Sequence, residues 1–207
     1  MNKLFLASQF YQVADKLSAL IPDSRALKVA FIPTAADTYA EKPWMEADRD
    51  KLVEMGFEVE DYDLKGKVET QIYNDLKPKD IIFVSGGNTF YLLYHIRQSG
   101  FDKAILRLLD EGKVYIGSSA GSMVMCPTIE PAKPLDNAEQ APLLTSFYGL
   151  HLVDFVILPH YGKPKYEQRY QDIMTEWSSK LKLQTLTDEQ VVIVVDGKHT
   201  IETVGVN

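Results

Sequence analysis

The stretch Val114-Tyr115-Ile116-Gly117-Ser118-Ser119-Ala120-Gly121 decides the fold of this chain. Three residues typical of a buried strand run into a serine, Ser119, that has a glycine two positions to either side. This spacing is that of a nucleophile elbow, a sharp turn from a strand into a helix that raises the serine hydroxyl above a sheet. Glycines flank such a turn because side chains there would collide with the tight backbone. The stretch therefore predicts an exposed, nucleophilic serine at the end of a strand.

Segments typical of strands and of helices alternate on both sides of the elbow, as they do in a parallel sheet covered by helices. Near the end of the chain, Asp196-Gly197 lies between two apolar runs and predicts a β-hairpin. We therefore expect one three-layer α/β domain over residues 1–207, with a mostly parallel sheet, helices on both faces and a C-terminal β-hairpin. The expected strands cover 4–7, 29–33, 57–62, 81–84, 114–116, 153–158, 191–195 and 199–204. The expected helices cover 10–20, 44–55, a segment that contains His95, 101–109 and a long segment that begins at Pro164.

The composition is that of an ordinary globular protein, with 207 residues of which 45% are hydrophobic and 25% charged. A formal net charge of −7 argues against a large basic surface for nucleic acid. Cys126 is the one cysteine in the sequence, so no intrachain disulfide forms and a reducing cytoplasm is the expected location. The apolar start is too short for a signal peptide, and the sequence has no run of 18 apolar residues, so we expect no membrane association.

A nucleophilic serine needs a base, which in turn needs an orienting partner. Of the four histidines, His160 follows an apolar run and a proline, and so falls at the carboxyl edge of a strand, where open α/β folds build their sites. We predict that His160 is the base. The other three have less suitable places, since His95 falls within an expected helix, His151 just before a strand and His199 in the hairpin.

Two adjacent acids, Asp188 and Glu189, precede the last apolar runs and are the candidates for the orienting partner. Either one would lie at a sheet edge, and the sequence leaves the choice between them open. The alternative for each is a solvated acidic turn. Asp136 and Asp154 are weaker candidates for the same role.

The oxyanion of an acyl-transfer intermediate is bound by backbone N–H groups near the nucleophile. The residue after an elbow serine supplies one of them, which here is Ala120. The run Gly86-Gly87-Asn88 follows another expected strand and is the candidate for the second, because glycine lets the backbone approach a substrate closely. The same run also fits a simple turn in which Asn88 caps the next helix.

Two further features have less specific interpretations. Cys126 has no elbow of its own, and a small buried hydrophobic residue fits it better than a thiol nucleophile. Residues 127–142 contain four prolines and no clear periodicity, so we expect a functional loop or lid rather than a plain connector. No group of His, Cys and Asp residues has the spacing of metal ligands, so no metal is expected.

Taken together, the motifs resemble the peptidase E family, the serine dipeptidases of family S51 also called α-aspartyl dipeptidases, with cyanophycinases as more distant relatives. The resemblance spans roughly positions 80 to 200, where the pieces come in the family's order. The pieces that carry it are Gly86-Gly87-Asn88-Thr89-Phe90, Gly117-Ser118-Ser119-Ala120-Gly121, Cys126-Pro127-Thr128-Ile129 and Pro159-His160.

The resemblance implies a fold similar to class I glutamine amidotransferases, with serine in place of their cysteine. It implies Ser119 as nucleophile, His160 as base, and a third member that falls on Asp188 or Glu189. It also implies Gly87 and Ala120 as oxyanion donors, near Asn88. No cofactor is implied.

One position departs from the family pattern. Relatives that prefer an N-terminal aspartate carry an arginine just before a Glu-Gln-Arg segment, whereas here Tyr166 precedes Glu167-Gln168-Arg169. A guanidinium clamp on a substrate carboxylate is therefore missing at that position. Lys163, Lys165 or Arg169 are the candidates to compensate, and we do not expect strict aspartate specificity.

We therefore expect a serine hydrolase of the peptidase E type, which cleaves dipeptides or very short peptides through an acyl-enzyme on Ser119. The residues expected to bind the oxyanion or the substrate are Gly87, Ala120, Asn88, Tyr166 and Arg169. A monomer or a weak homodimer is expected, with a small peptide as the partner. The alternatives are another amide or ester hydrolase on the same scaffold, and a non-catalytic homologue that binds a small ligand.

Overall fold

The fold is built on a central sheet, which a computed structural model describes within residues 2–23 and 26–205. Among these residues the sheet has seven strands in the order β3-β2-β4-β5-β1-β8-β9. The five strands from β3 to β1 are parallel, and β8 and β9 add an antiparallel hairpin at one edge. The strands are β1 (Lys3–Ala7), β2 (Lys28–Ile32), β3 (Glu58–Asp61), β4 (Ile81–Val84), β5 (Val114–Ser118), β8 (Gln190–Val195) and β9 (Lys198–Thr203).

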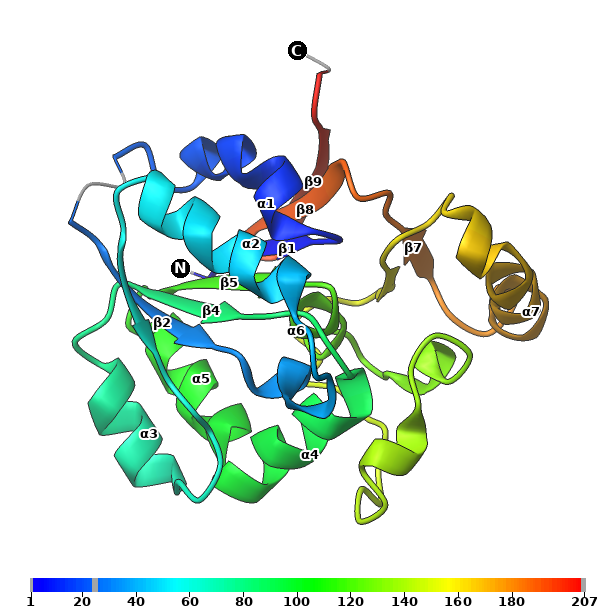
Figure 1. The fold of residues 1–207 in the computed structure, drawn as a ribbon, viewed down its shortest axis with the longest axis horizontal. Helices are drawn as coiled ribbons and strands as arrows, with labels where there is room; N and C mark the ends of the chain where they lie inside the picture. Colours follow the sequence, from blue (N-terminus) through cyan, green and yellow to red (C-terminus); the bar gives the residue numbers. More distant parts are fainter. Residues whose placement is uncertain (1, 24–25, 206–207) are drawn as a thin grey trace.

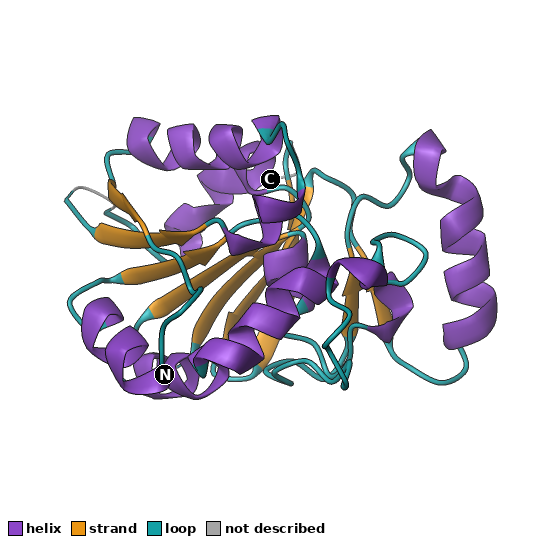
Figure 2. Ribbon diagram, turned by 60° about the horizontal axis from the view of Figure 1, so that its bottom comes forward, coloured by secondary structure: helices purple, strands orange, loops and turns teal. Residues whose placement is uncertain are grey.

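Helices cover both faces of this sheet (Figures 1 and 2). On one face lie α1 (Phe10–Val13), the 3₁₀ helix η1 (Ala14–Ala19) and α2 (Pro43–Glu54), and on the other lie α3 (Glu69–Leu76), α4 (Thr89–Ser99) and α5 (Phe101–Asp110). Alternate residues of each strand face the two layers, so the hydrophobic core is split in two by the sheet. In β4, for example, Phe83 packs on the α1 and α2 side, and Ile82 and Val84 pack on the other.

A smaller unit stands beside the carboxyl end of the sheet, at the right of Figure 1. It consists of β6 (Val156–Leu158), a 3₁₀ turn η5 (Pro164–Tyr166), α7 (Glu167–Trp177) and β7 (Leu183–Thr185). Strand β6 pairs in parallel with β7 in a sheet of its own. This corrects the expectation of a strand over 153–158, because residues 152–155 form a bend and only three residues pair, outside the main sheet.

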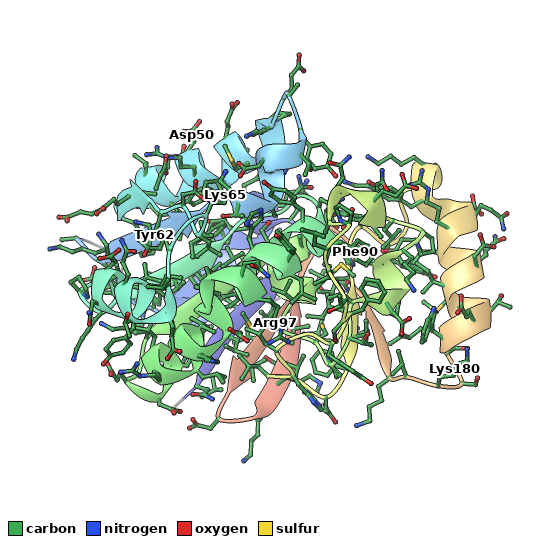
Figure 3. The ribbon with its side chains drawn as sticks, turned by 90° about the horizontal axis from the view of Figure 1, so that it is seen from below. Asp50, Tyr62, Lys65, Phe90, Arg97 and Lys180 are labelled. Carbon is green, nitrogen blue, oxygen red and sulfur yellow. The ribbon has the colours of Figure 1, made fainter. Side chains whose placement is uncertain are left out.

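The segment between the elbow and β6 is held against α4 rather than left free. Phe147 packs edge-on against Phe90, with ring centroids 5.5 Å apart. Arg97 donates to the carbonyl oxygens of Tyr148 and Gly149, at 3.1 and 3.2 Å. Figure 3 labels Phe90 and Arg97 on the side of α4 that faces this segment. The segment contains two short 3₁₀ helices, η3 (Glu130–Ala132) and η4 (Ala138–Gln140).

The predicted α/β fold, with its mostly parallel sheet, helices on both faces and C-terminal hairpin, is confirmed. The hairpin turns at Asp196 and Gly197, which have φ values of 50° and 77°, as a two-residue turn of this type requires. The expected helix over 10–20 changes to 3₁₀ geometry after Val13, and helix α7 begins at Glu167, after the 3₁₀ turn at Pro164. In the part of the chain that the structure describes, no helix has the length and apolar character to cross a bilayer.

Candidate active site

The elbow forms as predicted, between β5 and the short helix α6 (Ala120–Met123). Ser119 has φ 48° and ψ −106°, a conformation that side chains rarely adopt. Its backbone N–H donates to the Ala7 carbonyl oxygen at 3.0 Å, which ties the turn to β1. A Cβ atom at Gly121 would lie 2.1 Å from the Val84 carbonyl oxygen, so this position of the elbow requires glycine.

His160 reaches the elbow from the small unit, two residues after the end of β6. Its Nε2 lies 3.0 Å from Ser119 Oγ, and its Nδ1 lies 2.6 Å from Asp188 Oδ1. A carboxylate only accepts hydrogen bonds, so the proton of the neutral imidazole lies on Nδ1, and Nε2 is left to accept from the serine hydroxyl. The three side chains thus form one hydrogen-bonded chain in the order of a catalytic triad.

Asp188 is the acid that reaches His160. Burial by itself would raise the pKa of Asp188, but hydrogen bonds from His160, Lys163 and Ser8 outweigh that effect and hold the pKa well below its usual range. The Lys163 ammonium pairs with Oδ2, and the Ser8 hydroxyl donates to Oδ1 at 2.8 Å. Glu189, the other candidate, is exposed at the next position, so only one of the two predicted acids lies at the imidazole.

A cleft of about 280 Å³ opens above Ser119 at the carboxyl ends of β1, β4 and β5. The Trp44 indole N–H donates to the Gly86 carbonyl oxygen at 3.4 Å, and Tyr39 packs edge-on against Trp44. The volume of this cleft is near the lower end of the range for small-molecule sites. The lining residues are Ser8, Gln9, Tyr39, Trp44, Gly86, Gly87, Ser118, Ser119, Met123, Leu135, Asp136, Pro159, His160, Lys163, Lys165 and Tyr166.

Asp136 brings a carboxyl group into this cleft from the segment after the elbow. Its Oδ2 accepts from the Thr89 N–H at 2.9 Å and from the Thr89 hydroxyl at 2.5 Å. Burial raises the pKa of Asp136, against the opposing effects of Thr89, His160 and Arg169. Asp136 does not contact the imidazole as an orienting acid would, and Asp154, the other weak candidate, is exposed and pairs with Lys182.

The two expected oxyanion donors come from neighbouring parts of the fold, Gly87 from the turn after β4 and Ala120 from the first position of α6. Gly87 follows β4 and has φ 147°, and a Cβ there would lie 2.1 Å from the Ala35 carbonyl oxygen. Among the described residues, neither the Gly87 N–H nor the Ala120 N–H donates to a protein carbonyl.

Asn88 is not among the residues that line the cleft. Its Oδ1 accepts from the Tyr91 N–H at 2.9 Å, as the N-cap of α4, and its Nδ2 donates to the Asn137 carbonyl oxygen at 2.8 Å. Both ends of the amide are used within the protein and the residue is buried. Asn88 therefore connects the Gly-Gly turn to the segment that carries Asp136.

Tyr166 lies in the cleft, with its ring centroid 6.1 Å from that of His160. Arg169 is exposed and lies outside the cleft lining, with its guanidinium 5.6 Å from the Tyr166 ring centroid. Cys126 is buried, and burial raises the pKa of its thiol to about 12, which fits the predicted packing role. The described residues contain no group of side chains arranged to hold a metal ion.

The sequence interpretation missed Ser8 and did not place Lys163 next to Asp188. Ser8 directly follows the expected strand 4–7, so the strand-end argument used for His160 would also have selected it. The contacts of both residues with Asp188 depend on how the small unit sits against the main sheet. No local sequence pattern encodes that arrangement.

A model of peptidase family S51 matches residues 4–202. The chain belongs to peptidase family S51. An uncharacterized peptidase of Pasteurella multocida is 35% identical over 194 residues, which is 94% of each chain. A peptidase E of the cyanobacterium Nostoc is 35% identical over 160 residues, or 73% of this chain and 62% of that protein.

A solved structure agrees with this assignment to family S51. A Listeria monocytogenes crystal structure named for peptidase E superposes with a TM-score of 0.93 at 31% identity, over 99% of this chain and 100% of that one. A peptidase from an actinobacterium has a TM-score of 0.74 at 18% identity, which supports the fold alone. The resemblance drawn from the sequence motifs is therefore confirmed, and this chain is a peptidase by family.

Proposed function

We propose that this S51 family member is a serine-type dipeptidase that acts on dipeptides and very short peptides with a free amino terminus. The observation that carries the proposal is the chain Ser119–His160–Asp188, joined at 3.0 and 2.6 Å at the edge of a small cleft. Serine and histidine at this separation form the nucleophile and base of acyl transfer.

In the proposed reaction, Ser119 Oγ attacks the peptide carbonyl carbon while its proton passes to His160 Nε2. The carbonyl oxygen becomes an oxyanion, which the N–H groups of Gly87 and Ala120 bind. The imidazolium then gives its proton to the leaving amine as the C–N bond breaks, and an acyl-enzyme remains. A water molecule, deprotonated by His160, hydrolyses the ester and restores the Ser119 hydroxyl.

The charges around the cleft support a short zwitterionic substrate. Asp136 lines the cleft, and Thr89 occupies only its Oδ2, so we assign its Oδ1 to the substrate's α-ammonium group. Of the two cleft lysines, Lys163 is paired with Asp188, whereas Lys165 lies over the Tyr166 ring at 4.7 Å. We assign Lys165 to a substrate carboxylate, because a free dipeptide carries one group of each sign.

We propose that specificity for aspartate is weak. Tyr166 takes the place where the aspartate-preferring relatives carry arginine, and a phenol offers a carboxylate no bidentate pair. The test is hydrolysis of Asp-Xaa dipeptides beside matched Asn-, Glu- and Ala-Xaa dipeptides and simple esters. We expect turnover of several dipeptides at comparable kcat/KM. Strong preference for Asp-Xaa would overturn the specificity, and faster turnover of esters with no dipeptide hydrolysis would overturn the dipeptidase assignment.

A further inference from the structure

Ser8, at the carboxyl end of β1, is the one residue of the described chain whose side chain bonds both His160 and Asp188. It is buried and is one of the residues that line the cleft. The backbone N–H of His160 donates to Ser8 Oγ at 2.7 Å, and Ser8 Oγ lies 2.8 Å from Asp188 Oδ1. The hydroxyl has a single proton, and an N–H only donates, so the Ser8 proton points at Asp188.

The contact with Ser8 stabilises an unfavourable backbone conformation at His160. His160 has φ 65°, a left-handed conformation that costs energy for a residue other than glycine. Such conformations persist only where the surrounding structure fixes them. Ser8 holds the N–H of His160, and the Tyr170 hydroxyl donates to the carbonyl oxygen of the preceding residue, Pro159. The peptide unit that leads into the base is thus held at both ends.

The neighbouring residue of β1 holds the nucleophile. The Ala7 carbonyl oxygen accepts from the Ser119 N–H at 3.0 Å and from the Ser122 hydroxyl at 2.7 Å. The last residue of β1 and the residue that follows it therefore connect to both halves of the catalytic pair, Ala7 to the elbow and Ser8 to the base. Ser119 belongs to the main sheet and His160 to the small unit, so their 3.0 Å separation depends on a link between the two units.

We propose that Ser8 is a positioning residue for catalysis, which fixes the backbone of His160 and the carboxylate of Asp188 with one hydroxyl. The inference rests on the proposed function, in which His160 is the base. Removal of the hydroxyl leaves the His160 N–H without an acceptor and takes one of three donors from Asp188. The imidazole then samples orientations in which Nε2 no longer faces Ser119.

The first test is steady-state kinetics of Ser8→Ala on the best dipeptide. We expect kcat to fall roughly ten- to a hundredfold, the effect of losing a hydrogen bond to a charged group, with KM within about threefold because the Ser8 hydroxyl is already engaged with Asp188 and the His160 N–H. Ser99→Ala is the matched control, since Ser99 is also buried and hydrogen-bonded, to the His95 carbonyl oxygen, away from the triad. It should keep wild-type kcat. A Ser8→Ala enzyme with kcat within twofold of wild type would overturn the proposal.

The second test separates positioning from a general loss of structure. In an Asp188→Asn background the imidazole has already lost its anchor, so Ser8→Ala should cost much less there than in the wild type. Fully additive losses would show that Ser8 acts independently of Asp188, and would also overturn the proposal.

A third measurement uses the wild-type protein and needs no substrate. By NMR, the His160 amide proton should exchange slowly with solvent. A downfield signal of the His160 Nδ1–H proton should also be present, and its intensity should be lower in Ser8→Ala. Fast exchange of that amide in the wild type would contradict the hydrogen bond from the His160 N–H to Ser8, even if Ser8→Ala proves unable to fold. If the wild type hydrolyses no dipeptide, the dipeptidase proposal fails while this measurement still decides the role of Ser8.

Discussion

His160 Nε2 lies 3.0 Å from Ser119 Oγ, and both residues make this contact from a left-handed backbone, with φ of 65° and 48°. Each conformation costs free energy, of order 1–3 kcal/mol. The cost is offset by contacts to one strand, since the Ser119 N–H is held by the Ala7 carbonyl oxygen and the His160 N–H by Ser8. Backbone strain of this kind is concentrated at active sites, so its presence at both residues supports a catalytic role for the pair.

The orienting role of Asp188 is tested by Asp188→Asn. The amide keeps the size of the side chain but presents a donor to Nδ1 in one of its orientations, so the imidazole proton moves to the wrong nitrogen. We expect kcat to fall by about 10⁴, the size of this effect in a serine-protease triad.

Glu189→Gln is the matched control for Asp188→Asn, because Glu189 is adjacent in sequence but exposed. It should retain wild-type kcat. If kcat fell more in Glu189→Gln than in Asp188→Asn, the orienting acid would be Glu189 and the role given to Asp188 would be wrong.

The role of Asp136 is tested by Asp136→Asn, which keeps an oxygen acceptor for Thr89 and removes the charge. We expect KM for free dipeptides to rise roughly ten- to a hundredfold, as for loss of a charge-assisted hydrogen bond. For N-acetylated substrates, which have no ammonium group, KM should be the same in Asp136→Asn and in the wild type. Asp154→Asn, at an exposed acid paired with Lys182, is the control and should leave KM unchanged. Equal KM values for Asp136→Asn and wild type would exclude an ammonium site.

Much of the fold could be predicted from the sequence because the signals are local. The uniformly apolar runs of β4 and β5, the Gly-x-Ser-x-Gly spacing and the Asp-Gly turn each specify their own structure. Helix α3 and strand β7 were not predicted. β7 has three half-buried residues and no strong pattern, and it exists because β6 pairs with it.

The site divides in the same way. Ser119 and His160 each follow an apolar run, so the sequence could select them. Asp188 and Glu189 both lie in the turn before β8, and only the tertiary structure shows that Asp188 reaches His160 while Glu189 is exposed. The contacts of Ser8 and Lys163 with Asp188 depend on the placement of the small unit against the sheet, which is a tertiary property.

Gly87→Ala tests the packing of the turn after β4, which we propose supplies an oxyanion donor. Its new Cβ would lie 2.1 Å from the Ala35 carbonyl oxygen at a φ of 147°, so backbone must move. We expect the free energy of unfolding to fall by roughly 3 kcal/mol or more, with loss of activity. Gly112→Ala is the control, since Gly112 has φ 89° and open space around it, and should cost about 1–2 kcal/mol without loss of kcat. Urea denaturation measures both, and equal losses would contradict the proposed contact.

We predict that the buried acid Asp48 makes the free energy of unfolding depend on pH. This acid of α2 is buried, and burial raises its pKa to about 7 despite hydrogen bonds from Ser118 and from the Tyr11 N–H. The folded state therefore holds a proton that the unfolded state releases near pH 4. Asp48 thus contributes stability below pH 4 that is lost as the pH rises to 7, in total roughly 4 kcal/mol.

Asp48→Asn, which is neutral at every pH, isolates this effect. The free energy of unfolding of the wild type, minus that of Asp48→Asn, should be larger at pH 5 than at pH 8. Urea titrations at the two pH values measure the difference. A difference that does not change with pH would mean that Asp48 is ionised in the folded protein throughout this range.

The central claim is that Ser119 is the nucleophile of a peptidase. The most direct measurement compares wild type with Ser119→Ala in dipeptide hydrolysis and in covalent labelling by a fluorophosphonate, which reacts with activated serines. We expect the wild type to be labelled at Ser119 and to hydrolyse dipeptides, and Ser119→Ala to be unlabelled with kcat lower by several powers of ten. Full turnover in Ser119→Ala would contradict the account.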